Sequence, residues 1–276
     1  MDQQRRIQQV AWGLLGAGAA AWFAIWMIFF PQFVPDLFAW NVHPRAAQVF
    51  IGAGYVFRTA FFLNAAFETN WIRLRWIVYG NLVFTGTLLF GTYWHLDEFH
   101  WNPFQTPLAH LWIVLYIFEP VTMLYLVPRG MLHAAAPVSG GPIRPALKRF
   151  LVFMTGILLM NGLMIVVNPE FAVRRWPWEL NPLDARMVGA WFLGWATWCG
   201  TMAFATDWDE IRRACQLFIL NGTVLFVAAV VFRDDFLPGR GTVAGYIGAL
   251  VLMTLVMSGL FLLQERARPA AAPTSP

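Results

Sequence analysis

Two charged side chains stand in the middle of long apolar runs of this sequence. Arg58 lies in residues 46–67 and Glu119 lies in residues 107–127, and both runs are long enough to be membrane helices. Each charge comes 12 residues after its run begins (58 − 46 and 119 − 107), about 18 Å deep at 1.5 Å per residue. Because a lone charge at that depth costs about 3 kcal/mol or more, equal depth and opposite sign predict an ion pair.

Polar side chains are expected to gather around this pair. Tyr55 and Tyr116 each precede a charge by three residues and therefore share its helix face. Thr85, on the run 76–93, reaches a similar depth, while Asn64 and Asn81 should form a second polar level nearer the cytoplasm. The predicted site for a small solute or lipid consists of Arg58, Glu119, Tyr55, Tyr116 and Thr85.

Three classes of function are compatible with such a site. The first is a carrier or binding protein, in which Arg58 would neutralise an anion or Glu119 would exchange a proton. The second is a non-catalytic accessory or assembly subunit that packs against other membrane proteins, with the pair only locking one helix register. The third, a membrane enzyme, is disfavoured because the sequence shows no nucleophile, redox or metal motif, and we predict no cofactor.

One short loop contains metal-ligand side chains without a metal-ligand spacing. The segment HLDEFHW holds His95, Asp97, Glu98 and His100 within six residues. Because this spacing matches no standard motif, we predict a solvated loop and no metal site. The acidic runs 207–210 and 234–235, which lie beside arginines, are likewise expected to be solvated charge.

The elements that would position these residues follow from the composition. The chain has 276 residues, 59% hydrophobic and only 12% charged, with a mean hydropathy of +0.56. Soluble domains carry about 25% charge, so a soluble chain and a nucleic-acid-binding module are excluded, and the lipid bilayer becomes the expected environment. Eight apolar runs predict an all-α integral membrane protein, with spans at 10–30, 46–67, 76–93, 107–127, 148–167, 185–206, 214–232 and 242–264.

Basic residues orient these spans. Twelve of the 19 lysines and arginines lie on the side of both termini, six lie on the other side, and the remaining one is Arg58. Short cytoplasmic loops are enriched in such residues, which places both termini in the cytoplasm and the protein in the cell membrane. Tryptophan is expected at the membrane interfaces, and eight tryptophans fall at span ends: Trp40, Trp71, Trp76, Trp94, Trp101, Trp176, Trp178 and Trp208.

The chain also matches itself at a shift of half its length. At a shift of 138 residues, Trp40 aligns with Trp178 and Pro44 aligns with Pro182. We therefore predict two tandem four-helix repeats, 1–130 and 148–276, joined by a cytoplasmic linker at 131–147 and ending in a short cytoplasmic tail. Four helices is an even number, so the repeats should be related by an axis along the membrane normal.

A Trp-rich stretch of the second half has a wider likeness. Residues 176–192, WPWELNPLDARMVGAWF, resemble a signature of uncharacterised bacterial polytopic membrane proteins. The resemblance implies a bacterial membrane protein and carries no known chemistry. Read physically, Pro182 suits a turn before a helix, Asp184 favours the helix N-terminus, and Gly189 with Ala190 allow another helix to approach closely.

Overall fold

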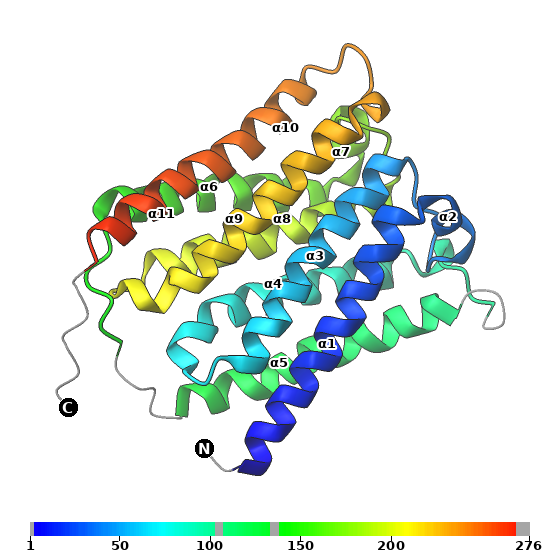
Figure 1. Cartoon of the computed structure of the whole chain (residues 1–276). Helices are drawn as coiled ribbons and strands as arrows, with labels where there is room; N and C mark the ends of the chain where they lie inside the picture. The colour runs from blue at the N-terminus through cyan, green and yellow to red at the C-terminus, as the bar shows by residue number, and fades with distance from the viewer. Residues whose placement is uncertain (1–2, 103–106, 133–137, 269–276) are drawn as a thin grey trace.

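The described part of the chain is built from helices. The computed structural model describes residues 3–102, 107–132 and 138–268, and these form helices and loops without a β-strand (Figure 1). Parts of the predicted linker, 133–137, and of the predicted tail, 269–276, lie outside the described residues.

The first half contains four long helices and one short helix. A polar cap starts α4, because the side chain of Asn70 accepts a hydrogen bond from the Ile72 amide. A single 3₁₀ turn, Leu96–Glu98, follows α4. The helices are α1 (Gln3–Phe29), α2 (Val34–Leu37), α3 (Arg45–Phe67), α4 (Trp71–Trp94) and α5 (Pro107–Leu132).

The second half presents the same order of long and short elements. Asn181 caps α8, and Asp207 forms a reciprocal capping box with Glu210 at the start of α9. A 3₁₀ turn, Arg233–Asp235, follows α9, and α10 continues into α11 through a widened turn at Leu252–Val256. The helices are α6 (Pro145–Val167), α7 (Pro169–Arg175), α8 (Pro182–Ala203), α9 (Trp208–Val231), α10 (Thr242–Val251) and α11 (Met257–Arg266).

Helices of the two halves interleave at the centre of the bundle. Within each half, α1 packs along α3 and α6 packs along α8; between the halves, α4 packs on α8 and α3 packs on α9 (Figure 1). The α4–α8 contact is very close at Gly80, where an added Cβ would lie 1.8 Å from Cδ1 of Trp198. The Trp198 indole donates to the Ile77 carbonyl at 2.7 Å, which fixes the two helices together.

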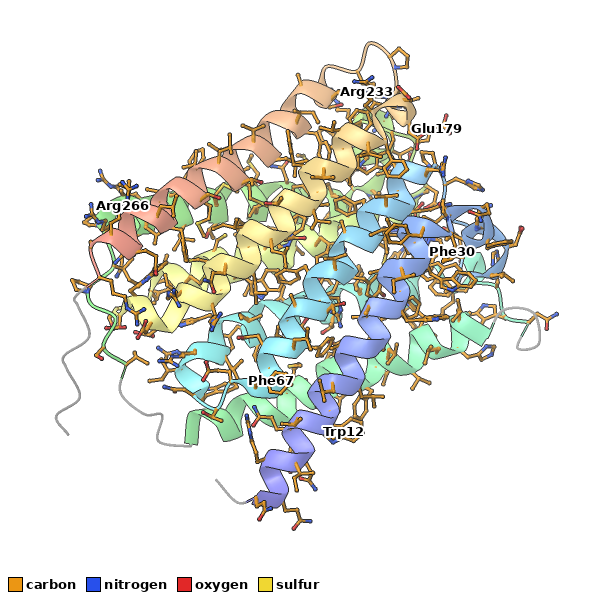
Figure 2. All side chains as sticks on the ribbon, viewed as in Figure 1. Trp12, Phe30, Phe67, Glu179, Arg233 and Arg266 are labelled. Carbon is orange, nitrogen blue, oxygen red and sulfur yellow. The ribbon has the colours of Figure 1, made fainter. Side chains whose placement is uncertain are left out.

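Six helical segments are long and apolar enough to cross a membrane. They are α1, α3, α5, α6, α9 and the continuous rod of α10 and α11. The coarser prediction, an all-helical protein with several such helices, is therefore confirmed. The predicted spans 76–93 and 185–206 fall on α4 and α8, which are not among the six, and α8 is buried along most of its length. Figure 2 shows Glu179 and Arg233 at one end of the bundle and Arg266 at the other.

The prediction of an interfacial tryptophan belt is wrong for four of the eight tryptophans at the span ends, since Trp76 is only 7% exposed and three others are enclosed still further. Trp40, Trp178 and Trp208 are almost fully enclosed by protein, with exposures of 1% or less. Trp40 and Trp178 contact residues of the other half, Asp184 and Phe50 respectively, while Trp208 packs on Phe261 of α11, so all three belong to the core. Trp94 and Trp101 are exposed, as an interfacial position requires.

Candidate functional site

The two charges singled out by the sequence form an ion pair between helices. Nη2 of Arg58, on α3, lies 2.5 Å from both carboxylate oxygens of Glu119, on α5. The predicted pair is therefore confirmed. Both side chains are largely enclosed, with exposed fractions of 5% for Arg58 and 12% for Glu119.

A third helix completes the hydrogen bonding of this pair. Nη1 of Arg58 donates to Oδ1 of Asn81 at 3.1 Å, and Nδ2 of Asn81 donates to Oε1 of Glu119 at 2.9 Å. Arg58, Asn81 and Glu119 thus form a closed ring of side chains from α3, α4 and α5, which we call the polar ring. The prediction that Asn81 belongs to a separate, more cytoplasmic level is wrong, because the long Arg58 side chain spans the offset between the backbone positions.

Aromatic faces surround the guanidinium. Its carbon lies 5.2 Å from the ring centre of Phe84, 5.3 Å from that of Phe62 and 5.9 Å from that of Tyr116. The hydroxyls of Tyr116 and Tyr55 lie 3.0 Å apart and bond to each other. The two tyrosines therefore meet beside the polar ring, as their spacing predicted.

Thr85 does not join the polar ring. Its hydroxyl donates to the carbonyl of Asn81, one turn earlier on the same helix, at 2.9 Å. Depth along the helix placed Thr85 correctly near the site, but its hydrogen bond is directed to the α4 backbone. Asn64 contributes no contact to the ring either, and its Nδ2 is buried without a hydrogen-bond partner.

The polar ring is closed in this structure, with one edge near the protein surface. Two small cavities beside Trp178, one next to Asp184 and the other next to Ala46, do not include Arg58 or Glu119 among their lining residues. Glu119 keeps an exposed fraction of 12%, although Tyr116 and Met123, which share its helix face, are buried. Nε of Arg58 is buried and has no hydrogen-bond partner, so the guanidinium retains one unused donor.

The histidine-containing loop forms structural contacts at the other end of α4. Nδ1 of His95 lies 2.6 Å from Oε1 of Glu98, while Nε2 of His95 contacts the guanidinium of Arg186 on α8. His100 contacts the carbonyl of Phe38 at 3.2 Å. Within the described residues, no three His, Cys, Asp or Glu side chains are grouped so as to hold a metal ion. The observed contacts join the loop to α8 and to the segment before α3.

Three of the acidic residues that we expected to be solvated, Asp207, Glu210 and Asp235, instead join separate segments of the chain, whereas Asp234 is exposed as expected. Glu210, only 4% exposed, pairs with Arg75 at 2.6 Å, and Asp207 accepts hydrogen bonds from the amides of Gly140 and Gly141. At the opposite end of the bundle, Asp235 accepts from the Ala46 amide at 2.7 Å. Sequence position alone placed these acids beside arginines but did not show that they cap helices.

The fold and the polar ring define a class: a helical protein with several helices long and apolar enough to span a membrane and a charged site in their interior. Comparisons of the chain with models of protein families, with curated proteins and with solved structures gave no match. The function must therefore be argued from the site itself.

Proposed function

We propose that the chain is a duplicated eight-span protein, in which α4 and α8 also cross the membrane. The order of elements supports this proposal, since the starts of α4 and α9 differ by 137 residues (208 − 71), as do those of the 3₁₀ turns that follow these helices (233 − 96). Burial supports it too, because a helix enclosed by other spans can cross the bilayer with a modest hydropathy. The excess of basic residues on the side of both termini supports a cytoplasmic position for both of them. The resemblance of residues 176–192 supports a bacterial cell membrane.

We further propose that this protein is a carrier or binding protein for a small solute or lipid with an anionic group. The observation that carries the proposal is the geometry at Arg58, whose guanidinium is already bound to a carboxylate at 2.5 Å inside the spans. In the closed state, Glu119 occupies the place of an anionic ligand. When a ligand binds Arg58, Glu119 is displaced and takes up a proton, so the buried charge stays balanced.

The position of Glu119 supports this exchange. It lies on α5, which packs mainly along α4, and the next residue is Pro120, which lacks the amide needed for a regular helical hydrogen bond. A shift of α5 alone would separate Glu119 from Arg58 and leave the hydrogen bond from Arg58 to Asn81 in place. The residual 12% exposure of Glu119 supports an opening toward the bilayer, from which a lipid or amphiphilic solute could enter.

The repeat provides a second argument. At shifts of 138 and 137 residues, Arg58 corresponds to Ala196 (58 + 138) and Glu119 corresponds to Val256 (119 + 137). The second half thus builds the same succession of helices without a charge at either position. A pair that the helix packing does not require is better explained by binding than by support.

The accessory-subunit alternative rests on the closure of the polar ring. A sealed and hydrogen-bonded pair can simply lock α3, α4 and α5 in register, and the exposed apolar helices could then contact a partner membrane protein. This alternative predicts that a stable partner co-purifies in mild detergent and that removing both charges together leaves the activity of that assembly intact.

Vesicle uptake of chosen anions tests the proposal. Purified protein would be reconstituted with lactate, phosphate or an alkyl sulfonate outside and a pH-sensitive dye inside. We expect anion uptake accompanied by internal acidification for at least one anion, loss of uptake in Arg58→Ala, and uptake without proton coupling in Glu119→Gln. Arg75→Ala is the matched control, because this arginine is also paired with a glutamate but lies at the end of the bundle.

Two results would contradict the proposal. One is transport by the Arg58→Ala/Glu119→Ala double variant at the parent rate. The other is the absence of anion-dependent uptake, and of any stabilisation by vesicles of anionic lipid, in the folded parent.

A further inference from the structure

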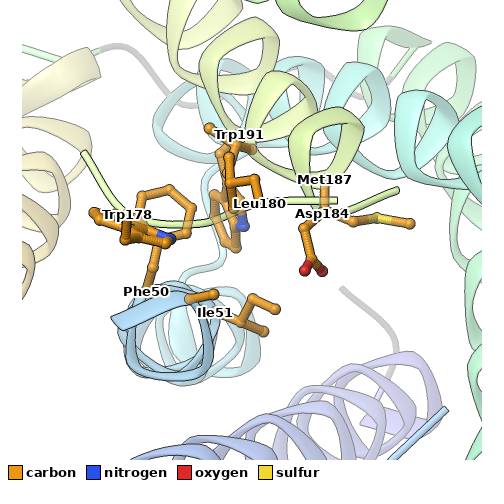
Figure 3. Close-up of a pocket in the computed structure, with 9 residues that line it drawn as sticks. Phe50, Ile51, Trp178, Leu180, Asp184, Met187 and Trp191 are labelled. Carbon is orange, nitrogen blue, oxygen red and sulfur yellow. The ribbon is translucent and has the colours of Figure 1, made fainter. Parts of the chain in front are cut away.

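A small internal cavity lies where the two halves meet near the start of α8. It has a volume of about 10 Å³, which is close to the minimum needed to hold one water-sized particle. Figure 3 shows Asp184 and Met187 on one side of it and Trp178 on the other, with Phe50 and Ile51 rising from α3. Both halves of the chain therefore contribute to its wall.

Asp184 has one carboxylate oxygen without a partner. Oδ1 accepts a hydrogen bond from the Trp40 indole at 2.8 Å, and the backbone amide donates to Asn181 at 2.6 Å. Oδ2 is buried and accepts no hydrogen bond, although the residue is only 3% exposed. A buried carboxylate oxygen without a donor is costly, so the site calls for a donor or a cation in the cavity that Asp184 lines.

The charges around Asp184 do not supply that cation. Arg186, two residues along α8, is directed to His95 and to the carbonyl of Val166. Glu98 lies near enough to act on Asp184 electrostatically, and its charge has the same sign. Within the described residues, no ion pair includes Asp184, which leaves its charge uncompensated.

The remaining wall of the cavity restricts which cation fits. Aromatic rings of Phe50, Trp178 and Trp191 line it, and Asp184 is the only charged lining residue. Divalent cations such as Ca²⁺ take six to eight oxygen ligands, which this wall does not provide. A soft monovalent cation is stabilised by one carboxylate together with aromatic faces, whose π electrons attract positive charge.

We propose that the Asp184 cavity is a binding site for a single ammonium ion or another monovalent cation of that size. The cation would contact Oδ2 and rest against the faces of Trp178 and Trp191, while the Trp40 indole holds Oδ1 in place. The site is separate from the polar ring, and its occupancy does not depend on the function proposed for Arg58 and Glu119. Because its wall comes from both halves, an ion bound there stabilises their contact.

Ion-dependent thermal stability of the purified full-length protein tests this proposal. Chlorides of ammonium, potassium, sodium and magnesium would be compared at equal ionic strength. A ligand at about ten times its Kd should raise Tm by roughly 2 to 4 °C. We expect that increment for ammonium, a similar or smaller one for potassium, and none for magnesium.

Three variants assign the increment to the cavity. Asp184→Asn should abolish the increment, and Trp178→Leu should reduce it while leaving the carboxylate in place. Asp235→Asn is the matched control, since this carboxylate, like that of Asp184, accepts a hydrogen bond from the first half but lies outside the cavity. An ammonium increment that persists in Asp184→Asn, or that disappears equally in Asp235→Asn, would overturn the proposal.

A direct measurement covers the case in which Asp184→Asn fails to fold. Crystals of the parent protein grown with thallium(I), which mimics potassium and ammonium, should show an anomalous peak beside Oδ2 of Asp184. A cavity that contains only water, without thallium, at saturating thallium would refute the cation site regardless of the variants.

Discussion

Removing Glu119 alone would leave the Arg58 guanidinium without its counter-ion in the interior of the bundle. In Glu119→Ala, Nη2 of Arg58 loses both of its contacts at 2.5 Å, and Nδ2 of Asn81 loses its acceptor at 2.9 Å. Because the Arg58 side chain is only 5% exposed, water cannot easily replace the carboxylate. Breaking one side of a buried pair costs about 3 to 5 kcal/mol, or roughly 6 to 15 °C in Tm.

Removing both charges should cost much less. In Arg58→Leu/Glu119→Leu, no charge remains in the interior, and the shorter apolar side chains fill part of the space between α3 and α5. Such replacements of a buried ion pair are often neutral or stabilising. The double variant should therefore be more stable than Glu119→Ala, with a coupling energy of about 3 kcal/mol in the mutant cycle Arg58→Leu, Glu119→Leu and their combination.

Thermal unfolding of the parent, the Glu119→Ala variant and the three cycle variants in one detergent measures these values. A second cycle at Arg75 and Glu210 is the matched comparison, because Arg75 is 32% exposed and solvent partly screens its charge; its coupling should be about 1 kcal/mol or less. If Arg58→Leu/Glu119→Leu were as unstable as Glu119→Ala, the cost would come from lost packing and not from an unpaired charge. Equal coupling in both cycles would show that burial of the pair has no special effect.

Three further predictions concern the packing and the helix ends. Gly80→Ala should destabilise the protein by about 1 to 3 kcal/mol in thermal unfolding, because the new Cβ would overlap the indole of Trp198 on α8. Gly86→Ala, on the same helix, meets open space and should be neutral or stabilising by up to about 1 kcal/mol. Burial raises the pKa of Asp184, which precedes the predicted span 185–206, to about 7 from an ordinary value of 3.8. The protonated form of Asp184 is therefore favoured in the folded state. Without ammonium or potassium, the Tm should be highest below about pH 4 and fall as the pH rises toward 7. Asp184→Asn should flatten that part of the pH profile of Tm. Glu210→Ala removes the capping box of α9 and should lower stability by about 1 to 2 kcal/mol, while Asp234→Ala, at a 95% exposed side chain, should change Tm little.

The ion pair could be predicted because of its isolation in the sequence. Arg58 and Glu119 are single charges in apolar runs, and a rise of 1.5 Å per residue is enough to compare their depths. The same calculation could not predict the place of Asn81, whose contact depends on how far the Arg58 side chain extends. It also could not predict that Thr85 bonds to its own helix, since depth does not fix the direction of a side chain.

The outer and inner ends of the helices were harder to predict for a related reason. Hydropathy locates a helix end but does not show which side chains face the other half of the protein. Trp178 and Glu210 therefore resembled interfacial and solvated residues, although both are buried in contacts between the halves. Hydropathy also does not include α8 among the helices that could span a membrane, because its tryptophans and glycines reduce the mean hydropathy of this enclosed helix.

The contacts of two tryptophans show how the proposed repeats complete each other. Trp40 of the first half donates a hydrogen bond to Asp184 of the second half. At a shift of 138 residues, Trp40 corresponds to Trp178 (178 − 40) and Asp184 corresponds to Ala46 (184 − 46). Trp178 and Ala46 also lie together, in the wall of a second cavity. At this second place the indole N–H has no partner, and a cavity of about 10 Å³ lies beside the alanine. Each half thus inserts a tryptophan against the other, as two copies related by a two-fold axis would, but only one contact is polar. Each tryptophan also packs on aromatic rings of its own half, Trp40 on Trp112 and Trp178 on Phe236, so both halves contribute to its burial.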